Sequence, residues 1–283
     1  MGRRIQFIFS GFALAMLGLL AWRVASGAWS PLHWAMLAVA GACSLLVFQR
    51  FVHVFNYSYA LASLLNGLLI AIWLQTPAAW LLGGLATAYG LRLALFTWHR
   101  QASPSYAPRV AKVGEADRQL PLPARLSLWL MCSLLYGFHL QSLAMAGSQV
   151  AFAGARPLWS PAVVAGAGLM LAGLLIEAIA DWQKQRVKAD DPQRLVTAGL
   201  YRRWRHPNYA GEILYQFGLI SAGLAGAMSI DDALTAVIAP AYIVLLMLSE
   251  AWRLDRVQSL RHGASEAYRR WRRQSASLWP RLW

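Results

Sequence analysis

Long apolar runs separated by short polar connections extend over the whole chain. A helix of about 20 apolar residues crosses a hydrocarbon core of about 30 Å. Eight runs approach that length, at 5–22, 32–48, 59–74, 78–96, 126–146, 162–180, 211–227 and 233–252. Pro77, Pro161 and the pair Asp231 and Asp232 mark boundaries, since proline and charge are tolerated best at helix ends. The pattern predicts an all-α polytopic membrane protein with about eight transmembrane helices, seven plus an extra N-terminal one.

The basic residues fall in alternate connections between these runs. If the N-terminus lies inside, then Arg50, the 100–125 stretch, the 184–205 stretch and the tail from Arg253 all lie inside as well. The opposite connections hold two arginines in all, and the last of them carries two aspartates. Because Lys and Arg concentrate in short cytoplasmic loops, this distribution predicts cytoplasmic N- and C-termini. A seven-span interpretation that omits the first helix keeps every other orientation.

Composition agrees with a single integral-membrane domain over residues 1–283. The chain is 58% hydrophobic and 13% charged, which is more apolar than an ordinary soluble domain. Its net charge of +14 alone suggests nucleic acid, but the placement of the basic residues between apolar runs indicates a membrane surface and no nucleic-acid partner. The first run resembles a signal peptide, but its length and its poor cleavage site favour a retained helix. Both cysteines lie in apolar segments, so we assign no disulfide framework and no metal site.

Ionisable residues at membrane depth are costly and therefore mark functional hypotheses. Glu177 and Asp181 stand four residues apart on one face of the predicted sixth helix, where like charges repel. A ligand donor, an arginine or protonation would compensate them, so a ligand role and an internal salt bridge both stay open. Arg92 and Glu250 either pair helices or contact a ligand.

The segment RHPNYAGE, residues 205–212, follows a basic connection. Pro207 suits the first turn of a helix, because its missing N–H costs nothing there. Asn208 and Glu212 then share a face one turn apart, with Tyr215 and Gln216 close to the same line. A helix N-terminus with arginines nearby is a natural anion site, although the basic connection alone is equally typical of topology or of anionic-lipid contact. We predict a ligand site at this helix entry.

The run EAIADWQKQRVKADDPQRLVTAGLYRRWRHPNYAGE, residues 177–212, resembles the C-terminal half of the steroid 5-alpha-reductase family, and is closest to its bacterial branch. Weaker similarity continues to AYGLRLALFTWHR in the fourth span and ASEAYRRWRRQSASLWP in the tail. The resemblance implies a membrane enzyme whose C-terminal half, 177–283, binds NADPH. It also implies an oxidoreductase acting on CH–CH groups, which reduces a carbon–carbon double bond conjugated to a carbonyl. The substrate would be a lipophilic steroid- or isoprenoid-like small molecule, and no obligate protein partner is evident.

Site residues follow from the resemblance and from the polar positions above. Tyr89 would lie near the substrate carbonyl, with Arg92 beside it as a second catalytic residue. The residues expected to bind the cofactor are Glu177, Asp181, Arg186, Tyr201, Arg205, His206, Asn208, Tyr209 and Glu212. On an earlier span, family members tend to carry an acid or glutamine for the substrate carbonyl, whereas FNYSYAL here offers Asn56, Tyr57 and Tyr59 but no acid.

Two other function classes compete with this reading. Membrane methyltransferases of the isoprenylcysteine and phospholipid type, which use S-adenosylmethionine, share an R-H-P-x-Y-x-G element. The EAIADWQ helix and the glutamate directly after the glycine favour the reductase. A transporter or lipid-binding scaffold would distribute polar groups through the midplane, whereas here they cluster at the cytoplasmic ends of the later spans. His139, in LYGFHLQS, is expected to be a satisfied buried histidine. The expected location is a membrane, the inner or plasma membrane if the protein is bacterial, with the active site facing the cytoplasm.

Overall fold

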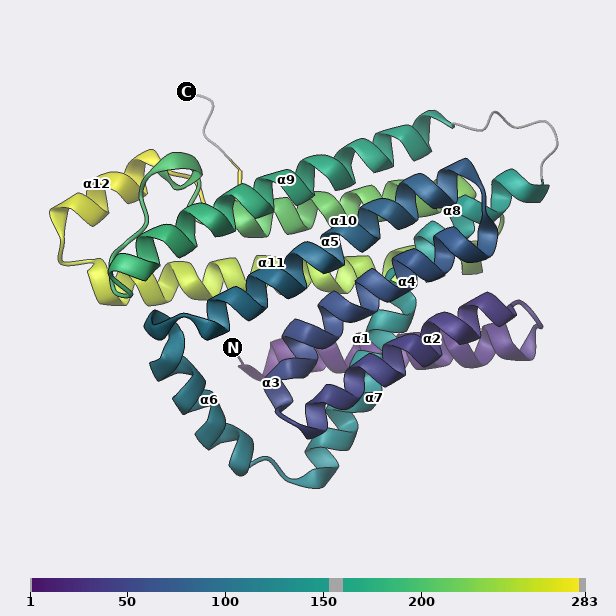
Figure 1. Ribbon diagram of the computed structural model, residues 1–283, viewed down its shortest axis with the longest axis horizontal. Helices are drawn as coiled ribbons and strands as arrows, with labels where there is room; N and C mark the ends of the chain where they lie inside the picture. The colour runs from purple at the N-terminus through teal and green to yellow at the C-terminus, as the bar shows by residue number, and fades with distance from the viewer. Residues whose placement is uncertain (1, 153–159, 280–283) are drawn as a thin grey trace.

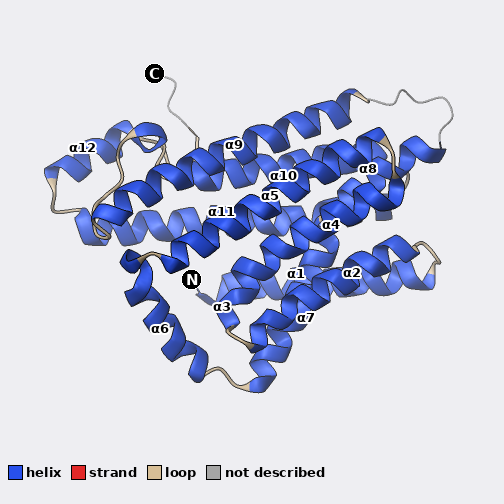
Figure 2. Ribbon diagram, in the orientation of Figure 1, coloured by secondary structure: helices blue, strands red, loops and turns tan. Residues whose placement is uncertain are grey.

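The computed structural model describes residues 2–152 and 160–279, and it is 85% helix. Figure 2 shows only helices and loops in these residues. The one extended pairing printed for them is an isolated β-bridge between Trp204 and Ala276. The all-α prediction is therefore confirmed.

The described chain forms sixteen helical elements of very different length. In order they are α1 (Gly2–Ala25), α2 (Pro31–Ser44), η1 (Leu45–Phe48), α3 (Phe51–His53), η2 (Val54–Ser58), α4 (Tyr59–Leu74), α5 (Pro77–Ala102), η3 (Pro104–Tyr106), α6 (Ala107–Arg118), α7 (Leu122–His139), α8 (Gln141–Phe152), α9 (Pro161–Asp190), η4 (Gly199–Arg202), α10 (Pro207–Gly226), α11 (Ile230–His262) and α12 (Glu266–Gln274).

Six helices within the described residues are long and apolar enough to cross a membrane, which indicates an integral membrane protein. They are Pro31–Phe48, Phe51–Leu74, Pro77–Ala102, Leu122–Ser148, Pro161–Asp190 and Ile230–His262. Of the two other predicted spans, the first is α1, whose described apolar stretch Ser10–Ala25 is shorter. The other is α10, which has 20 residues. A count of eight spans stays a prediction.

The predicted fifth span forms the centre of the bundle. In its helix, Leu122–Ser148, 78% of an apolar 18-residue stretch is buried, whereas the corresponding stretch of each of the other five helices is at most 44% buried. The helix is interrupted at Leu140, where α7 ends and α8 begins. His139 is the last residue before this break, and both His139 and Leu140 are buried inside the bundle.

The helices α9 and α10 lie side by side along most of their length (Figure 1), and their backbones touch at glycines. A Cβ on Gly173 would lie 2.5 Å from both the Gly211 carbonyl oxygen and the Tyr215 amide nitrogen. A Cβ on Gly211 would lie 2.7 Å from the Glu177 amide nitrogen. Small residues allow this close approach between membrane helices. The contact brings Glu177 on α9 next to the first turns of α10.

One end of the bundle is rich in basic residues, and α12 there, EAYRRWRRQ, has four arginines. The beginning of α1, helix α6 and helix α12 lie at the same end in Figure 1, which we call the basic end. There Asp117 on α6 accepts a hydrogen bond from the Phe51 amide (2.6 Å) and pairs with Arg125 (3.2 Å), which ties α6 to α3 and α7. At the opposite end Arg23 donates to Asp232 (2.7 Å), which ties α1 to α11.

The α9–α10 contact predicts the effect of adding a single methyl group. Gly173→Ala inserts a Cβ against backbone atoms that cannot rotate away, and we expect a loss of about 1–3 kcal/mol in the free energy of unfolding. The matched control is Gly168→Ala on the same helix, where nothing lies within 4 Å of the new Cβ. Thermal unfolding of both variants in one detergent measures the difference, and equal midpoints would contradict the contact.

Candidate functional site

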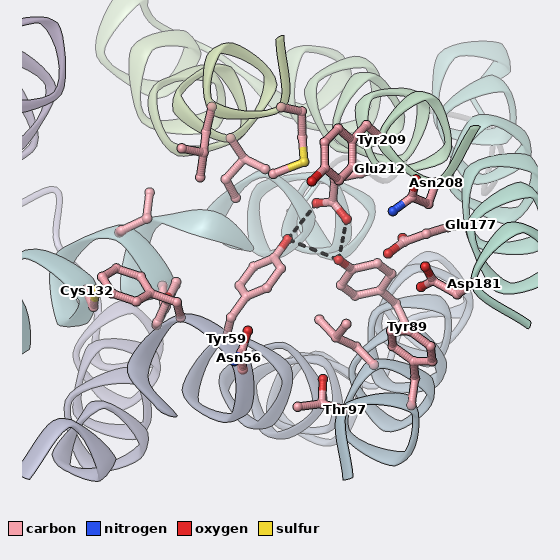
Figure 3. Close-up of a pocket in the computed structure, with 18 of the residues that line it drawn as sticks. Asn56, Tyr59, Tyr89, Thr97, Cys132, Glu177, Asp181, Asn208, Tyr209 and Glu212 are labelled. Atoms are coloured by element: carbon pink, nitrogen blue, oxygen red, sulfur yellow. Dashed lines mark hydrogen bonds between the residues drawn. The ribbon is translucent and has the colours of Figure 1, made fainter. Parts of the chain in front are cut away.

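A cavity of about 320 Å³ lies within the bundle, enclosed by segments from η2 to α11. Its polar lining includes Asn56, Tyr59, Tyr89, Glu177, Asp181, Asn208, Tyr209 and Glu212. Figure 3 shows these side chains turned toward a shared space. The facing wall is mostly apolar and includes Phe55, Met131, Leu135, Ile243, Leu246 and Met247. We call this space the central cavity.

An irregular turn brings the phenol of Tyr59 to this cavity. Residues Val54–Ser58 form a π-helical turn between α3 and α4, and such turns add a residue to the helix and are frequent at functional sites. The buried Ser58 hydroxyl donates to the Cys43 carbonyl (2.7 Å), which holds the turn against α2. Asn56 and Tyr59 line the central cavity, whereas Tyr57 is outside its lining and donates to Gln101 (3.4 Å).

The carboxylate of Glu212 accepts hydrogen bonds from two phenols. Tyr59 donates to Oε1 (2.9 Å) and Tyr89 donates to Oε2, and the two phenolic oxygens are 3.4 Å apart (Figure 3). The ring of Tyr89 stacks on Tyr215 at 4.3 Å, which fixes its orientation. Because a buried carboxylate needs donors in place of water, the phenols stabilise Glu212 and are positioned by it.

Two further side chains, Gln216 and His139, form hydrogen bonds with this cluster. Gln216, one turn along α10, donates to Glu212 Oε1 (2.6 Å) and to the Tyr59 hydroxyl (3.1 Å). His139 Nε2 lies 3.1 Å from Gln216 Oε1 and 3.3 Å from the Tyr59 hydroxyl. The expectation that His139 is buried and hydrogen-bonded is confirmed, and its partners belong to the phenol–carboxylate cluster.

Arg92 lies between the two acids of α9. It bridges Glu177 (2.8 Å) and Asp181, so of the two alternatives that the sequence left open the structure shows an internal salt bridge. Both acids also line the central cavity. Glu177 Oε2 is buried and, among the described residues, has no hydrogen-bond partner. Two carboxylates thus share one guanidinium, and one acceptor atom stays free for a donor from a ligand.

Cations gather at one side of the central cavity. Arg100 lines it, with its guanidinium 5.1 Å from the Tyr106 ring, and Arg109 lies 5.8 Å from the same ring. Lys184 follows Asp181 by three residues on α9 and is within electrostatic range of both arginines. Within the described part of the chain none of these three cations forms a salt bridge, so their charge is available to an anion.

A second, smaller cavity of about 100 Å³ begins at Lys184, and we call it the basic cavity. Its ionisable lining residues are Lys184, Lys188, Arg194, Tyr201, Arg205, His206, Arg261 and His262. The hydroxyl of Tyr201 is buried without a partner in the described structure. Burial, reinforced by the nearby Asp181 carboxylate, raises the pKa of Tyr201 well above its ordinary value, so this hydroxyl keeps its proton and can donate. The basic cavity is suited to a phosphate-sized anion.

The structure divides the predicted site residues into three places. Tyr89, Glu177, Asp181, Asn208, Tyr209 and Glu212 meet at the central cavity, and Tyr201, Arg205 and His206 line the basic cavity. Asp255 Oδ1 on α11 also lies within hydrogen-bond distance of Arg205 Nε and of His206 Nε2, at 2.9 Å in each case. Arg186 lies in an outer groove between α5 and α9, with its guanidinium over Trp182, and Arg92 borders that groove.

Sequence reasoning missed three members of the central cluster as site residues, namely Tyr59, Gln216 and His139. Tyr59 and Gln216 were visible as polar positions in apolar spans. No helical period links them to His139, because the three residues are on separate helices, α4, α7 and α10, and lie 77 or more residues apart in the chain. Arg100 was hidden among the other basic residues of its connection.

Because Arg92 is shared by two buried acids, removing it should destabilise the protein more than removing an exposed arginine. Arg92→Met leaves Glu177 and Asp181 buried without a cation, and we expect a cost of about 3–5 kcal/mol in the free energy of unfolding. The control is Arg253→Met, which breaks an exposed pair with Glu250, where a cost of about 0–1 kcal/mol is expected. The side chain of Arg92 is 16% exposed and that of Arg253 is 53% exposed. Comparable losses in thermal unfolding would argue against a buried cluster.

Comparison with known proteins identifies one family for most of the chain. The family described as "Protein of unknown function (DUF1295)" matches residues 53–275, from α3 to the end of α12, so α1 and α2 lie outside the match. No curated protein and no solved structure matches the chain.

Proposed function

We propose that this chain, which belongs to the DUF1295 family, is a membrane-embedded NADPH-dependent reductase of a carbon–carbon double bond conjugated to a carbonyl in a lipophilic substrate. The family is related to steroid 5-alpha-reductase-like membrane proteins, in keeping with the resemblance of residues 177–212. One observation carries the proposal. Asp181 lines the acidic central cavity, and Lys184, less than one turn later on α9, lines the basic cavity.

The two cavities complement the two chemically different ends of a dinucleotide. The free Oε2 of Glu177 and the amide of Asn208 suit a nicotinamide carboxamide, which both donates and accepts hydrogen bonds. Arg100 and Lys184 suit a diphosphate, near the point where α10 begins and exposes its free N–H groups. The basic cavity beyond them suits the additional phosphate of NADPH, and this favours NADPH over NADH.

The remaining walls would hold the substrate. When bound, NADPH supplies a hydride for the β-carbon of the conjugated system. The Tyr89 hydroxyl is positioned to donate to the carbonyl oxygen, where it would stabilise the enolate charge that develops. The apolar wall of Met131, Leu135, Ile243 and Leu246 would bury a lipophilic body and exclude water from the reacting atoms.

An S-adenosylmethionine-dependent methyltransferase is the second candidate. The observation in its favour is the acidic and phenolic wall of the central cavity, which suits a positively charged sulfonium as well as a carboxamide. The basic cavity counts against it, because S-adenosylmethionine has no phosphate group for Lys184, Lys188 and Arg194 to bind.

The proposal includes a membrane orientation. Eight spans with both termini in the cytoplasm would place the basic end of the bundle on the cytoplasmic side, as the positive-inside rule requires. Both cavities have basic residues of that end in their linings, so a cytoplasmic dinucleotide would reach them without crossing the membrane. The membrane would be the inner or plasma membrane of a bacterium.

Cofactor binding is tested by thermal stability. A ligand that binds only the folded protein stabilises it, by about 2.7 kcal/mol at a concentration 100 times its Kd. We expect NADPH to raise the unfolding midpoint, NADH to raise it less and S-adenosylmethionine to leave it unchanged. Asp181→Asn, Asn208→Ala and Glu212→Gln should each weaken NADPH binding by about tenfold or more, the equivalent of about 1.4 kcal/mol for one lost polar contact.

The matched control for these variants is Glu266→Gln on α12, whose side chain is 71% exposed and lines neither cavity. It should bind NADPH as the wild type does. Stabilisation by S-adenosylmethionine alone would replace the reductase by the methyltransferase. Wild-type NADPH affinity in all three site variants would show that the cofactor does not occupy the central cavity.

A further inference from the structure

We propose that Tyr59 is a catalytic residue, a second hydroxyl that donates with Tyr89 to the substrate oxygen. This inference rests on the proposed reductase function and deepens it. It concerns a residue that the sequence left without a role, on a span where the expected acid is missing.

The two phenolic oxygens form a pair at the central cavity. They are 3.4 Å apart, they come from separate helices, α4 and α5, and both residues line the cavity (Figure 3). An oxygen atom placed between two donors at this separation accepts a hydrogen bond from each at ordinary length. Two donors converging on one oxygen are the arrangement that stabilises a developing oxyanion.

The carboxyl group of Glu212 is an oxygen acceptor that both phenols already contact. It is buried, and Tyr59 donates to its Oε1 while Tyr89 donates to its Oε2. A substrate carbonyl has a single oxygen, which would accept from both phenols because their oxygens are only 3.4 Å apart. Glu212 would retain the hydrogen bond from Gln216 (2.6 Å) and gain one from the cofactor carboxamide, so the exchange leaves no buried charge without donors.

The other phenols at the cavity are less suited to this role. Tyr136 donates to the Val54 carbonyl at 2.8 Å, so its proton is already committed to the backbone. Tyr209 is stacked on His206, and no hydrogen bond joins its hydroxyl to Tyr89 among the described residues. Tyr242 packs against Phe12 on the apolar side. Tyr59 is the one whose hydroxyl lies within hydrogen-bond distance of Tyr89.

The atoms and electrons of the step balance without any further reactant. Hydride from NADPH forms the new C–H bond at the β-carbon, and the electron pair of the double bond moves toward the carbonyl as an enolate held by both phenols. A proton from the phenol pair is then transferred to the substrate, which becomes the saturated ketone after tautomerisation. The phenolate regains a proton from water. NADPH is oxidised to NADP⁺ and the double bond is reduced.

The test compares two neighbouring tyrosines of the π turn. Tyr59→Phe removes the proposed donor, and Tyr57→Phe removes a hydroxyl that is outside the lining of the central cavity. The probe is 2-naphthol, an aromatic analogue of an enolate, titrated by fluorescence into the NADP⁺ complex in detergent. NADPH binding is measured in parallel on each variant by thermal shift, which also shows that each variant is folded.

We expect Tyr59→Phe to bind NADPH like the wild type but to bind 2-naphthol at least tenfold more weakly, with Tyr57→Phe unchanged in both. With 2-cyclohexenone or a long-chain alkenone as substrate, kcat should fall on the order of 100-fold in Tyr59→Phe. Wild-type affinity for 2-naphthol in Tyr59→Phe would overturn the assignment and leave the cofactor site intact. The same holds if the wild type binds NADPH but not 2-naphthol. Failure of the wild type to bind NADPH would overturn both the proposed function and this inference.

Discussion

The arrangement of the site depends on the backbone contact between α9 and α10. Gly173 and Gly211 allow the two helices to approach until a single added methyl group would meet backbone atoms at about 2.5–2.7 Å. Lipid offers no hydrophobic force between helices, so close van der Waals packing of this kind is what holds membrane helices together. The consequence is chemical. The contact sets Glu177 and Asp181 on α9 beside Asn208 and Glu212 on α10, and it thereby places three acids around one cavity.

So much acid in an apolar interior requires compensation, and the structure provides it in two ways. Arg92 neutralises part of the α9 pair by a shared salt bridge, while two phenols and Gln216 donate to Glu212. Both arrangements are nearly complete, but Glu177 Oε2 is left without a donor in the described structure. Buried polar atoms in native proteins are normally satisfied, so an orphan acceptor that borders a cavity indicates where a ligand donor belongs.

The difference in charge between the linings of the two cavities is what favours a dinucleotide-dependent function. Asp181 and Lys184 are three residues apart on α9, yet one faces an acidic and phenolic space and the other a space lined by five Lys and Arg side chains. A small neutral or purely anionic ligand would match only one of these environments. A dinucleotide with a carboxamide at one end and phosphates at the other matches both, and the apolar wall beside it leaves room for a lipophilic partner in the reaction.

The sequence by itself determined the class of fold and two of the helix faces that line the central cavity. Periodic apolar runs have one stable outcome in a membrane, because only a helix satisfies its own backbone, so the all-α architecture followed from hydropathy. The spacing of Glu177 with Asp181, and of Asn208 with Glu212, predicted shared faces that the structure confirms. Tertiary structure alone decided the partners. Tyr59, His139 and Gln216 come from α4, α7 and α10 and lie 77 or more residues apart in the chain, so no local pattern could bring them together. The same holds for Arg205 and His206, which the sequence grouped with Asn208. Both residues line the basic cavity, where hydrogen bonds to Asp255, some 50 residues later in the chain, hold them.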